Sequence, residues 1–186
     1  MDLLPQLYAC RPTLNSLDFG ELVVNNADVQ GELKGRIAEF FVKTWLRACE
    51  GVTFDSDLTY RTGKYDPRRT PNGVVIIQRK QTFYEYDELI FHKGRPYGVE
   101  IKALDLNGIE GKLQKGIDLG RDLYQREDFA ILLFFPAYTN KVRDVERIQE
   151  RFPQVCCIDS GYKKKQIENA MRRYPLAPTS PQPATT

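Results

Sequence analysis

The feature that most constrains the fold is the apolar run FAILLFF at 129–135, which contains no polar residue. A strand exposed on one face alternates polar and apolar residues, so a short, wholly apolar run predicts a strand that is covered on both faces. VVIIQ at 74–78 and QVCCID at 154–159 are also predicted to be buried strands. Strands of this kind need helices above and below them, which predicts an α/β layer architecture.

Helical patterns precede and separate these strands. In 28–51, apolar residues recur at spacings of three and four, which is typical of an amphipathic helix, with Asp28 as its N-cap and Gly51 as its stop. The order of elements is a helix, an antiparallel hairpin and then alternating helices and strands. This order predicts a central mixed β-sheet flanked by helices on both faces. Further helices are predicted within 107–127, 140–152 and 163–174.

The length of 186 residues predicts one domain, which we place at 1–174 with a core of about 28–160. The first 27 residues give no clear pattern, because prolines and asparagines interrupt their short apolar runs. The segment 175–186 is rich in proline and threonine and carries little that could be buried, so we expect a disordered tail.

The composition excludes several kinds of site. His92 is the only histidine, and the four cysteines form no CxxC pair, so zinc and iron–sulfur sites are not expected. A net charge of +2 is too small to indicate a nucleic-acid partner by itself, although basic clusters occur at 61–69, 78–80 and 163–165. No apolar run approaches the roughly 20 residues that span a bilayer, and the N-terminus lacks a secretory pattern. We therefore expect a cytoplasmic protein without a membrane partner.

The stretch YEYDELIFHKGRPYGVEIKA at 84–103 predicts two strands folded back around HKGRP. A two-residue turn would place Asp87 opposite Glu100 and Glu85 opposite Lys102. A four-residue turn would place Asp87 opposite Lys102, with Glu100 on the diagonal. Because side chains alternate along a strand, both registers put Asp87, Glu100 and Lys102 on one face.

Two carboxylates on one face of a hairpin repel each other, and this repulsion raises the pKa of one of them. Lys102 would offset part of the repulsion. A divalent cation such as Mg²⁺ or Mn²⁺ would offset more, because carboxylate oxygens are the hard ligands that these ions prefer. The plain alternative is a set of solvent-facing charges on a half-exposed hairpin, where an ion pair contributes little to stability.

The pattern D-x12-EIK that begins at Asp87, preceded by a helix that carries Glu39, resembles the PD-(D/E)XK nuclease superfamily. That group includes many restriction endonucleases, Holliday-junction resolvases and RecB-type nuclease domains. The resemblance covers about 31–136 and depends more on the order of elements than on the letters. Tyr86 stands where the family's name has a proline, and the long segment 51–82 is interpreted as an insertion that contacts substrate.

The resemblance implies a restriction-endonuclease-like core and a Mg²⁺-dependent (or Mn²⁺-dependent) endonuclease that hydrolyses DNA. Asp87 and Glu100 would bind the ion together with the backbone carbonyl of Ile101. Lys102 would position or help deprotonate the attacking water and steady the charge that grows on the phosphate. Glu39 would act from the helix, through a metal-bound water or on a second ion.

Residues outside the hairpin receive roles as well. Gln114 and Tyr124 lie where RecB-like members carry a glutamine and a tyrosine on the helix after the lysine strand, so they are candidate accessory residues. A homodimer would supply the two active sites that cutting both strands of a duplex usually takes. Phosphate contacts are predicted for 163–165 and for the basic residues Arg61, Lys64, Arg68, Arg69, Arg79 and Lys80. Base stacking, if single strands bind, is predicted for Tyr60, Tyr65, Tyr84 and Tyr86.

Two other functions compete with a deoxyribonuclease. One is a catalytically inactive nucleic-acid-binding or assembly module that retains the nuclease fold, although a pure binder has no need of opposed carboxylates. The other is an RNA-directed nuclease such as the tRNA-splicing enzymes. Their metal-free site is centred on a histidine, which fits poorly with His92 in a predicted turn.

Overall fold

The computed structural model describes residues 3–19, 22, 30–58, 64–103, 106, 108–136 and 142–174. Its centre is a five-stranded sheet in the order β1-β5-β6-β7-β8, in which β1, β5 and β6 run antiparallel while β7 and β8 continue in parallel with β6. The predicted α/β class with a central mixed sheet is confirmed. The strands are β1 (Val52–Phe54), β5 (Glu88–His92), β6 (Arg95–Ile101), β7 (Ala130–Phe135) and β8 (Val155–Asp159).

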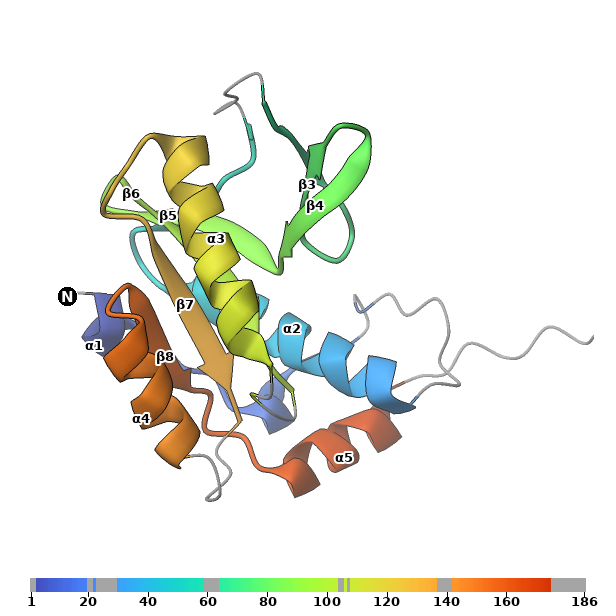
Figure 1. The fold of residues 1–186 in the computed structure, drawn as a ribbon. Helices are drawn as coiled ribbons and strands as arrows, with labels where there is room; N and C mark the ends of the chain where they lie inside the picture. Colours follow the sequence, from blue (N-terminus) through green and yellow to red (C-terminus); the bar gives the residue numbers. More distant parts are fainter. Residues whose placement is uncertain are drawn as a thin grey trace, which may run out of the picture.

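Helices cover both faces of this sheet, as Figure 1 shows. On β7, Leu132 and Phe134 enter the layer formed with α2, whereas Ile131 and Leu133 enter the layer formed with α3. The run 129–135 is thus covered on both faces, as predicted. In the described part of the chain, no helix has the length and apolarity that crossing a membrane requires. One layer holds α1 (Leu3–Ala9), α2 (Gln30–Ala48) and α5 (Lys164–Arg173), and the other holds α3 (Ile109–Tyr124) and α4 (Val142–Arg151).

The N-terminal region, where no clear pattern was found, contains α1 and a short 3-10 turn (Leu14–Ser16). The indole Nε1–H of Trp45 donates to the carbonyl of Leu7 at 2.6 Å, which ties α1 to α2 inside the core. Gly51 takes a left-handed conformation three residues after α2 ends, in agreement with its predicted role as a stop. The predicted N-cap Asp28 and the tail 175–186 lie outside the described residues.

The segment 51–82 forms most of a second sheet, with strand order β2-β3-β4 and antiparallel pairing throughout. Arg79 and Lys80 join β3 to β4, and their positive φ angles of 50° and 65° are those of a two-residue hairpin turn. Figure 1 shows β3 and β4 standing apart from β7, at the upper right of the view. The three strands are β2 (Asp66–Arg69), β3 (Val74–Gln78) and β4 (Gln81–Tyr86).

The predicted hairpin 84–103 is therefore shorter than expected, because the chain passes from one sheet to the other at Asp87. Glu85 pairs with Val75 of β3, so the predicted pairing of Glu85 with Lys102 is wrong. The physical reason is the bend at Asp87, beyond which the chain leaves the second sheet, so that β4 pairs with β3 while β5 pairs with β6.

Candidate functional site

A two-residue turn of Lys93 and Gly94 joins β5 to β6. Both residues have positive φ angles, 51° and 74°, and His92 pairs with Arg95 across the turn. The structure thus has the first of the two registers that the sequence allowed. His92 itself is buried, and its Nε2 lies 2.7 Å from the Oε1 of Gln6, so it is a core residue rather than a solvated turn residue.

Asp87 lies at the bend between β4 and β5. Its backbone N–H donates to the carbonyl of Val99 at 3.0 Å, and its Oδ2 accepts the backbone N–H of Ile101 at 2.5 Å. Because Val99 and Ile101 flank Glu100 on β6, these two bonds hold Asp87 beside Glu100. The predicted proximity of the two carboxylates is confirmed.

The Glu100 carboxylate is fully buried on the face of the sheet that α3 covers. Its Oε1 accepts the hydroxyl proton of Tyr84 at 2.7 Å, and its Oε2 contacts the Nζ of Lys112 at 2.5 Å. Burial, and then the charge of Asp87, raise the pKa of Glu100 from an ordinary value of 4.5 to about 7, although Lys112 and Tyr84 oppose the increase.

Lys112 is the cation of this site, and the sequence analysis did not identify it. Burial by itself would lower its pKa, but the charges of Glu100 and Asp87 outweigh burial and raise it. Its position in the sequence could have indicated that it faces the sheet, because it lies one residue before the buried Leu113 and three after the buried Ile109. That place is the edge of the helix face that packs on the sheet.

Glu39 reaches the site from α2, on the other side of the sheet. Burial, and then the charge of Asp87, raise the pKa of Glu39, while the nearby Arg36 and Lys43 oppose the increase. Arg36 pairs with Glu39 at 3.0 Å. The charge of Asp87 thus acts on both Glu39 and Glu100, because it raises the pKa of each. The role of Glu39 in catalysis stays a prediction.

Two glycines let α3 lie close enough to the sheet for Lys112 to reach Glu100. A Cβ atom at Gly116 would collide with the hydroxyl oxygen of Tyr84, and one at Gly120 would collide with the Phe129 ring. The carbonyl of Gly116 also accepts the hydroxyl proton of Tyr86 at 2.5 Å. These close approaches explain why glycines stand inside a helix, where they lower its intrinsic stability.

Lys102 and Ile101 occupy positions that differ from their expected roles. Lys102 follows the last residue of β6, and its backbone N–H donates to the carbonyl of Phe134 at 2.9 Å. Among the ion pairs of the described residues, the cation at Glu100 is Lys112 rather than Lys102. The half-buried Lys102 side chain therefore does not neutralise Glu100 in this arrangement, and its role toward water stays a prediction, as does the metal contact of the Ile101 carbonyl.

Gln114 and Tyr124 are both engaged away from the carboxylates. Gln114 is exposed on α3 and its Nε2–H donates to Asp118 at 3.0 Å. Tyr124 is buried, and its hydroxyl donates to Asp55 at 2.7 Å. The helix after the lysine strand therefore contributes Lys112 to the site, where the resemblance implied a glutamine and a tyrosine.

The predicted phosphate-binding residues lie on or near the second sheet. Arg69 is used internally, since it pairs with the buried Glu88 at 2.8 Å and donates to the carbonyl of Asp55 at 2.6 Å. Arg61 lies outside the described residues. A cavity of about 380 Å³ on this sheet is lined by the other four predicted cations, Lys64, Arg68, Arg79 and Lys80, together with Tyr65, Asp66 and Ile77.

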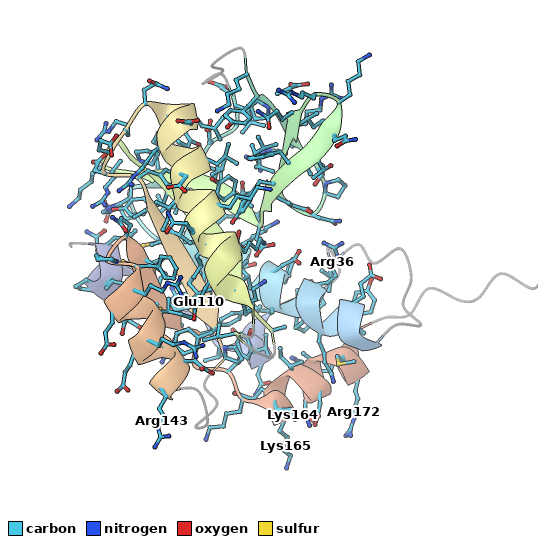
Figure 2. All side chains as sticks on the ribbon, in the orientation of Figure 1. Arg36, Glu110, Arg143, Lys164, Lys165 and Arg172 are labelled. Carbon is cyan, nitrogen blue, oxygen red and sulfur yellow. The ribbon has the colours of Figure 1, made fainter. Side chains whose placement is uncertain are left out.

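The predicted stacking tyrosines and the last basic cluster do not converge with the site. Tyr65, Tyr84 and Tyr86 are buried, so they do not present ring faces to a base, and Tyr60 lies outside the described residues. Figure 2 shows Lys164 and Lys165 on the far side of α5 from Arg36. The cluster 163–165 therefore belongs to a different surface from the candidate site.

Among the described residues, no three His, Cys, Asp or Glu side chains are placed so that they could hold a metal ion. The oxygen donors near Asp87 are its own carboxylate and that of Glu100, which repel each other, and Glu39 also interacts with Asp87. In the comparisons with known proteins, no family model, curated protein or solved structure matched the chain. The function therefore has to be argued from the chemistry of these residues.

Proposed function

We propose that this protein is a metal-dependent endonuclease that hydrolyses DNA phosphodiester bonds, as a member of the PD-(D/E)XK superfamily. The observation that carries the proposal is the fully buried Glu100 carboxylate held beside Asp87. Burying a carboxylate costs several kcal/mol, and a second carboxylate next to it adds to that cost. A fold that only needed stability would have an apolar residue here, so strongly perturbed carboxylates of this kind indicate a functional site.

The residues fit a hard divalent cation in their chemistry. Asp87 and Glu100 supply carboxylate oxygens, which are the donors that Mg²⁺ and Mn²⁺ prefer, and the Ile101 carbonyl would be a further donor. Bound at these residues, Mg²⁺ would supply a nucleophilic hydroxide at neutral pH and would neutralise charge on the phosphate. The Lys112 contact to Glu100 has to open first, because its ammonium occupies one of the two carboxylate oxygens.

The side chains around the carboxylates then divide the remaining work. Tyr84 orients Glu100 through its hydroxyl and keeps one oxygen fixed. Lys112, once released from Glu100, is a cation within reach of the scissile phosphate, a role that the resemblance gives to Lys102. Lys102 keeps its proposed role in positioning the attacking water, and Glu39 remains the candidate for a metal-bound water or a second ion.

A second candidate function is a catalytically inactive nucleic-acid-binding or assembly module. The observation that favours it is that both oxygens of Glu100 already have partners inside the protein, Tyr84 and Lys112. In that case the ion pair with Lys112 would be a permanent substitute for the metal, and the protein would bind nucleic acid without cutting it.

A cleavage assay on supercoiled plasmid separates these functions. We expect nicked or linear product with Mg²⁺ or Mn²⁺ and none with EDTA. Asp87→Asn should reduce cleavage at least 100-fold, because the variant loses a metal-binding charge. Lys102→Ala and Lys112→Ala compare the two candidate lysines, and the exposed Glu127→Gln is the matched control that should leave cleavage unchanged.

Cleavage that persists in EDTA or in Asp87→Asn would reject the proposed mechanism. Binding without cleavage across single-stranded, duplex and branched DNA, and across RNA, would favour the inactive module instead.

A further inference from the structure

A small groove lies between α2 and the turn 70–73 that joins β2 to β3, and its volume is about 210 Å³. The α2 residues that line it are at positions 36, 39, 40, 43 and 47, so each has a neighbour three or four residues away and they share one face of the helix. None of them belongs to the basic clusters that the sequence analysis identified. The lining includes Arg36, Glu39, Phe40, Lys43 and Arg47 from α2, with Pro71 and Asn72 from the turn.

The groove has a rigid wall that adjoins the candidate active site. The Nζ of Lys43 donates to the carbonyl of Asn72 at 3.0 Å, which ties α2 to the turn. Gly73 packs closely on the end of β4. A Cβ atom at Gly73 would collide with the carbonyl oxygen of Tyr86 and would lie 3.0 Å from the carbonyl oxygen of Asp87. The turn is therefore fixed directly beside Asp87.

Glu39 connects the groove to the candidate site. It lines the groove, and its electrostatic coupling to Asp87 shows that the two carboxylates are near each other. A ligand that occupies the groove would therefore continue toward Asp87, beside which the turn 70–73 is fixed.

The charge of the groove is positive and partly uncompensated. Arg36 pairs with Glu39, but among the ion pairs of the described residues neither Lys43 nor Arg47 has a carboxylate partner. The guanidinium of Arg47 lies over the Phe54 ring, 5.4 Å from its centre, which leaves its charge in place. Three cations against one carboxylate in the lining favour an anionic ligand.

The shape of the groove favours a chain over a complete small molecule. Its volume is below the roughly 300–1,000 Å³ of ordinary small-molecule sites. Phe40 and Pro71 supply apolar surface between the cations. A ligand that matches this lining carries anionic and apolar groups in alternation. A sugar–phosphate backbone has this pattern, because its phosphates bind Arg and Lys while its sugars contact apolar side chains.

We propose that the groove between α2 and the turn 70–73 binds the sugar–phosphate backbone of the nucleic-acid strand adjacent to the scissile bond, with Lys43 and Arg47 as phosphate ligands. The inference builds on the proposed nuclease function and names the surface on which its substrate lies. Figure 2 shows Arg36 of this surface on the side of α2 away from α5, whose Lys164, Lys165 and Arg172 point in another direction. Arg143 and Arg172, both labelled in Figure 2 and outside the predicted phosphate-binding clusters, provide a matched pair of control residues.

The test measures binding of fluorescently labelled duplex and single-stranded oligonucleotides in EDTA, so that cleavage plays no part. Affinity is recorded over a series of NaCl concentrations for the wild type, for Lys43→Gln/Arg47→Gln and for the control Arg143→Gln/Arg172→Gln, which removes two exposed arginines. Two lost phosphate contacts should reduce the slope of log K against log salt by about 1.8 for a duplex or about 1.4 for a single strand. The control should keep the wild-type slope.

Lys43→Arg/Arg47→Lys, which retains both charges, should restore most of the slope and separates a charge effect from a disturbed turn. An unchanged slope in Lys43→Gln/Arg47→Gln overturns the inference, even if the protein cleaves DNA. A reduced slope in a protein that never cleaves would support the groove as a phosphate-binding surface and would reject the nuclease function, together with the position beside a scissile bond. A wild type that binds neither oligonucleotide overturns both.

Discussion

Two buried glutamates on neighbouring strands, Glu88 on β5 and Glu100 on β6, are each paired with one cation. Arg69 contacts both oxygens of Glu88, at 2.8 and 3.0 Å, and Glu88 also accepts the backbone N–H of Leu89. Because Arg69 comes from β2, this pair fastens the second sheet to the first. Its partners are the Nη1 of Arg69, which donates to both oxygens, and a backbone donor, which together satisfy the carboxylate.

Glu100 has a single ammonium and a hydroxyl as partners, and it has Asp87 as a like-charged neighbour. The pKa of Glu100 is raised to about 7 in spite of its cation. The comparison teaches that a buried ion pair by itself does not indicate a functional site. The distinguishing feature is a repulsion between carboxylates that the protein's own groups leave partly uncompensated.

The largest expected effect on stability tests the pair of Glu88 and Arg69, to which we assign a structural role. Arg69→Met should lower the free energy of unfolding by about 3 kcal/mol, the lower end of the range for breaking a buried pair, because the Arg69 side chain is 38% exposed. Urea denaturation measures the loss. Arg68→Met, which breaks an exposed pair with Asp66, is the control and should cost less than about 1 kcal/mol. Equal losses in the two variants would contradict a structural role for the Arg69 pair.

The pH dependence of stability tests Glu100, to which we assign a functional role. Because the folded pKa of Glu100 is above its unfolded value, the native state holds an extra proton between pH 4.5 and 7, and stability falls as pH rises through this window. Glu100→Gln removes that dependence. Relative to the wild type, the variant should gain about 2 to 3 kcal/mol between pH 4.5 and pH 7 in urea denaturation without metal. A difference that stays constant with pH would show that Glu100 titrates normally.

The smallest expected effect concerns the hydroxyl at Glu100. Tyr84→Phe removes its donor to Oε1 and should cost about 1.5 kcal/mol above pH 8, where Glu100 is charged, the lower end for a bond to a charged group. This cost should decline as pH falls and Glu100 becomes protonated. The control Tyr86→Phe removes a bond to the uncharged carbonyl of Gly116 and should cost about 1 kcal/mol at every pH. Parallel pH profiles for the two variants would argue against a charged Glu100.

Local patterns made part of this structure predictable. The apolar run 129–135 identified β7 as a strand covered on both faces, because the pattern depends only on which faces of a strand are buried. The proximity of Asp87 and Glu100 followed from a two-residue turn and the alternation of side chains. Both inferences concern residues whose relative positions are set within one or two adjoining elements.

The remainder depended on contacts between distant elements. The ion pair between Lys112 and Glu100 requires the rotation of α3 about its axis and its distance from the sheet, and neither is encoded in the spacing of one helix. The partner of Glu85 depended on whether β4 would pair with β3 or with β6, a competition that alternation cannot decide. Arg69 matched a basic surface cluster in sequence, yet a buried carboxylate from another sheet determined its position.

The glycines of α3 have a consequence for the chemistry of the carboxylates. Gly116 and Gly120 set how deeply the helix sits on the strands, because any side chain at either position would push the helix outward. A shift of even one methyl group would draw the ammonium away from Glu100 and leave that carboxylate with less compensation. Two positions without side chains therefore govern how strongly the acidic pair would attract an external cation.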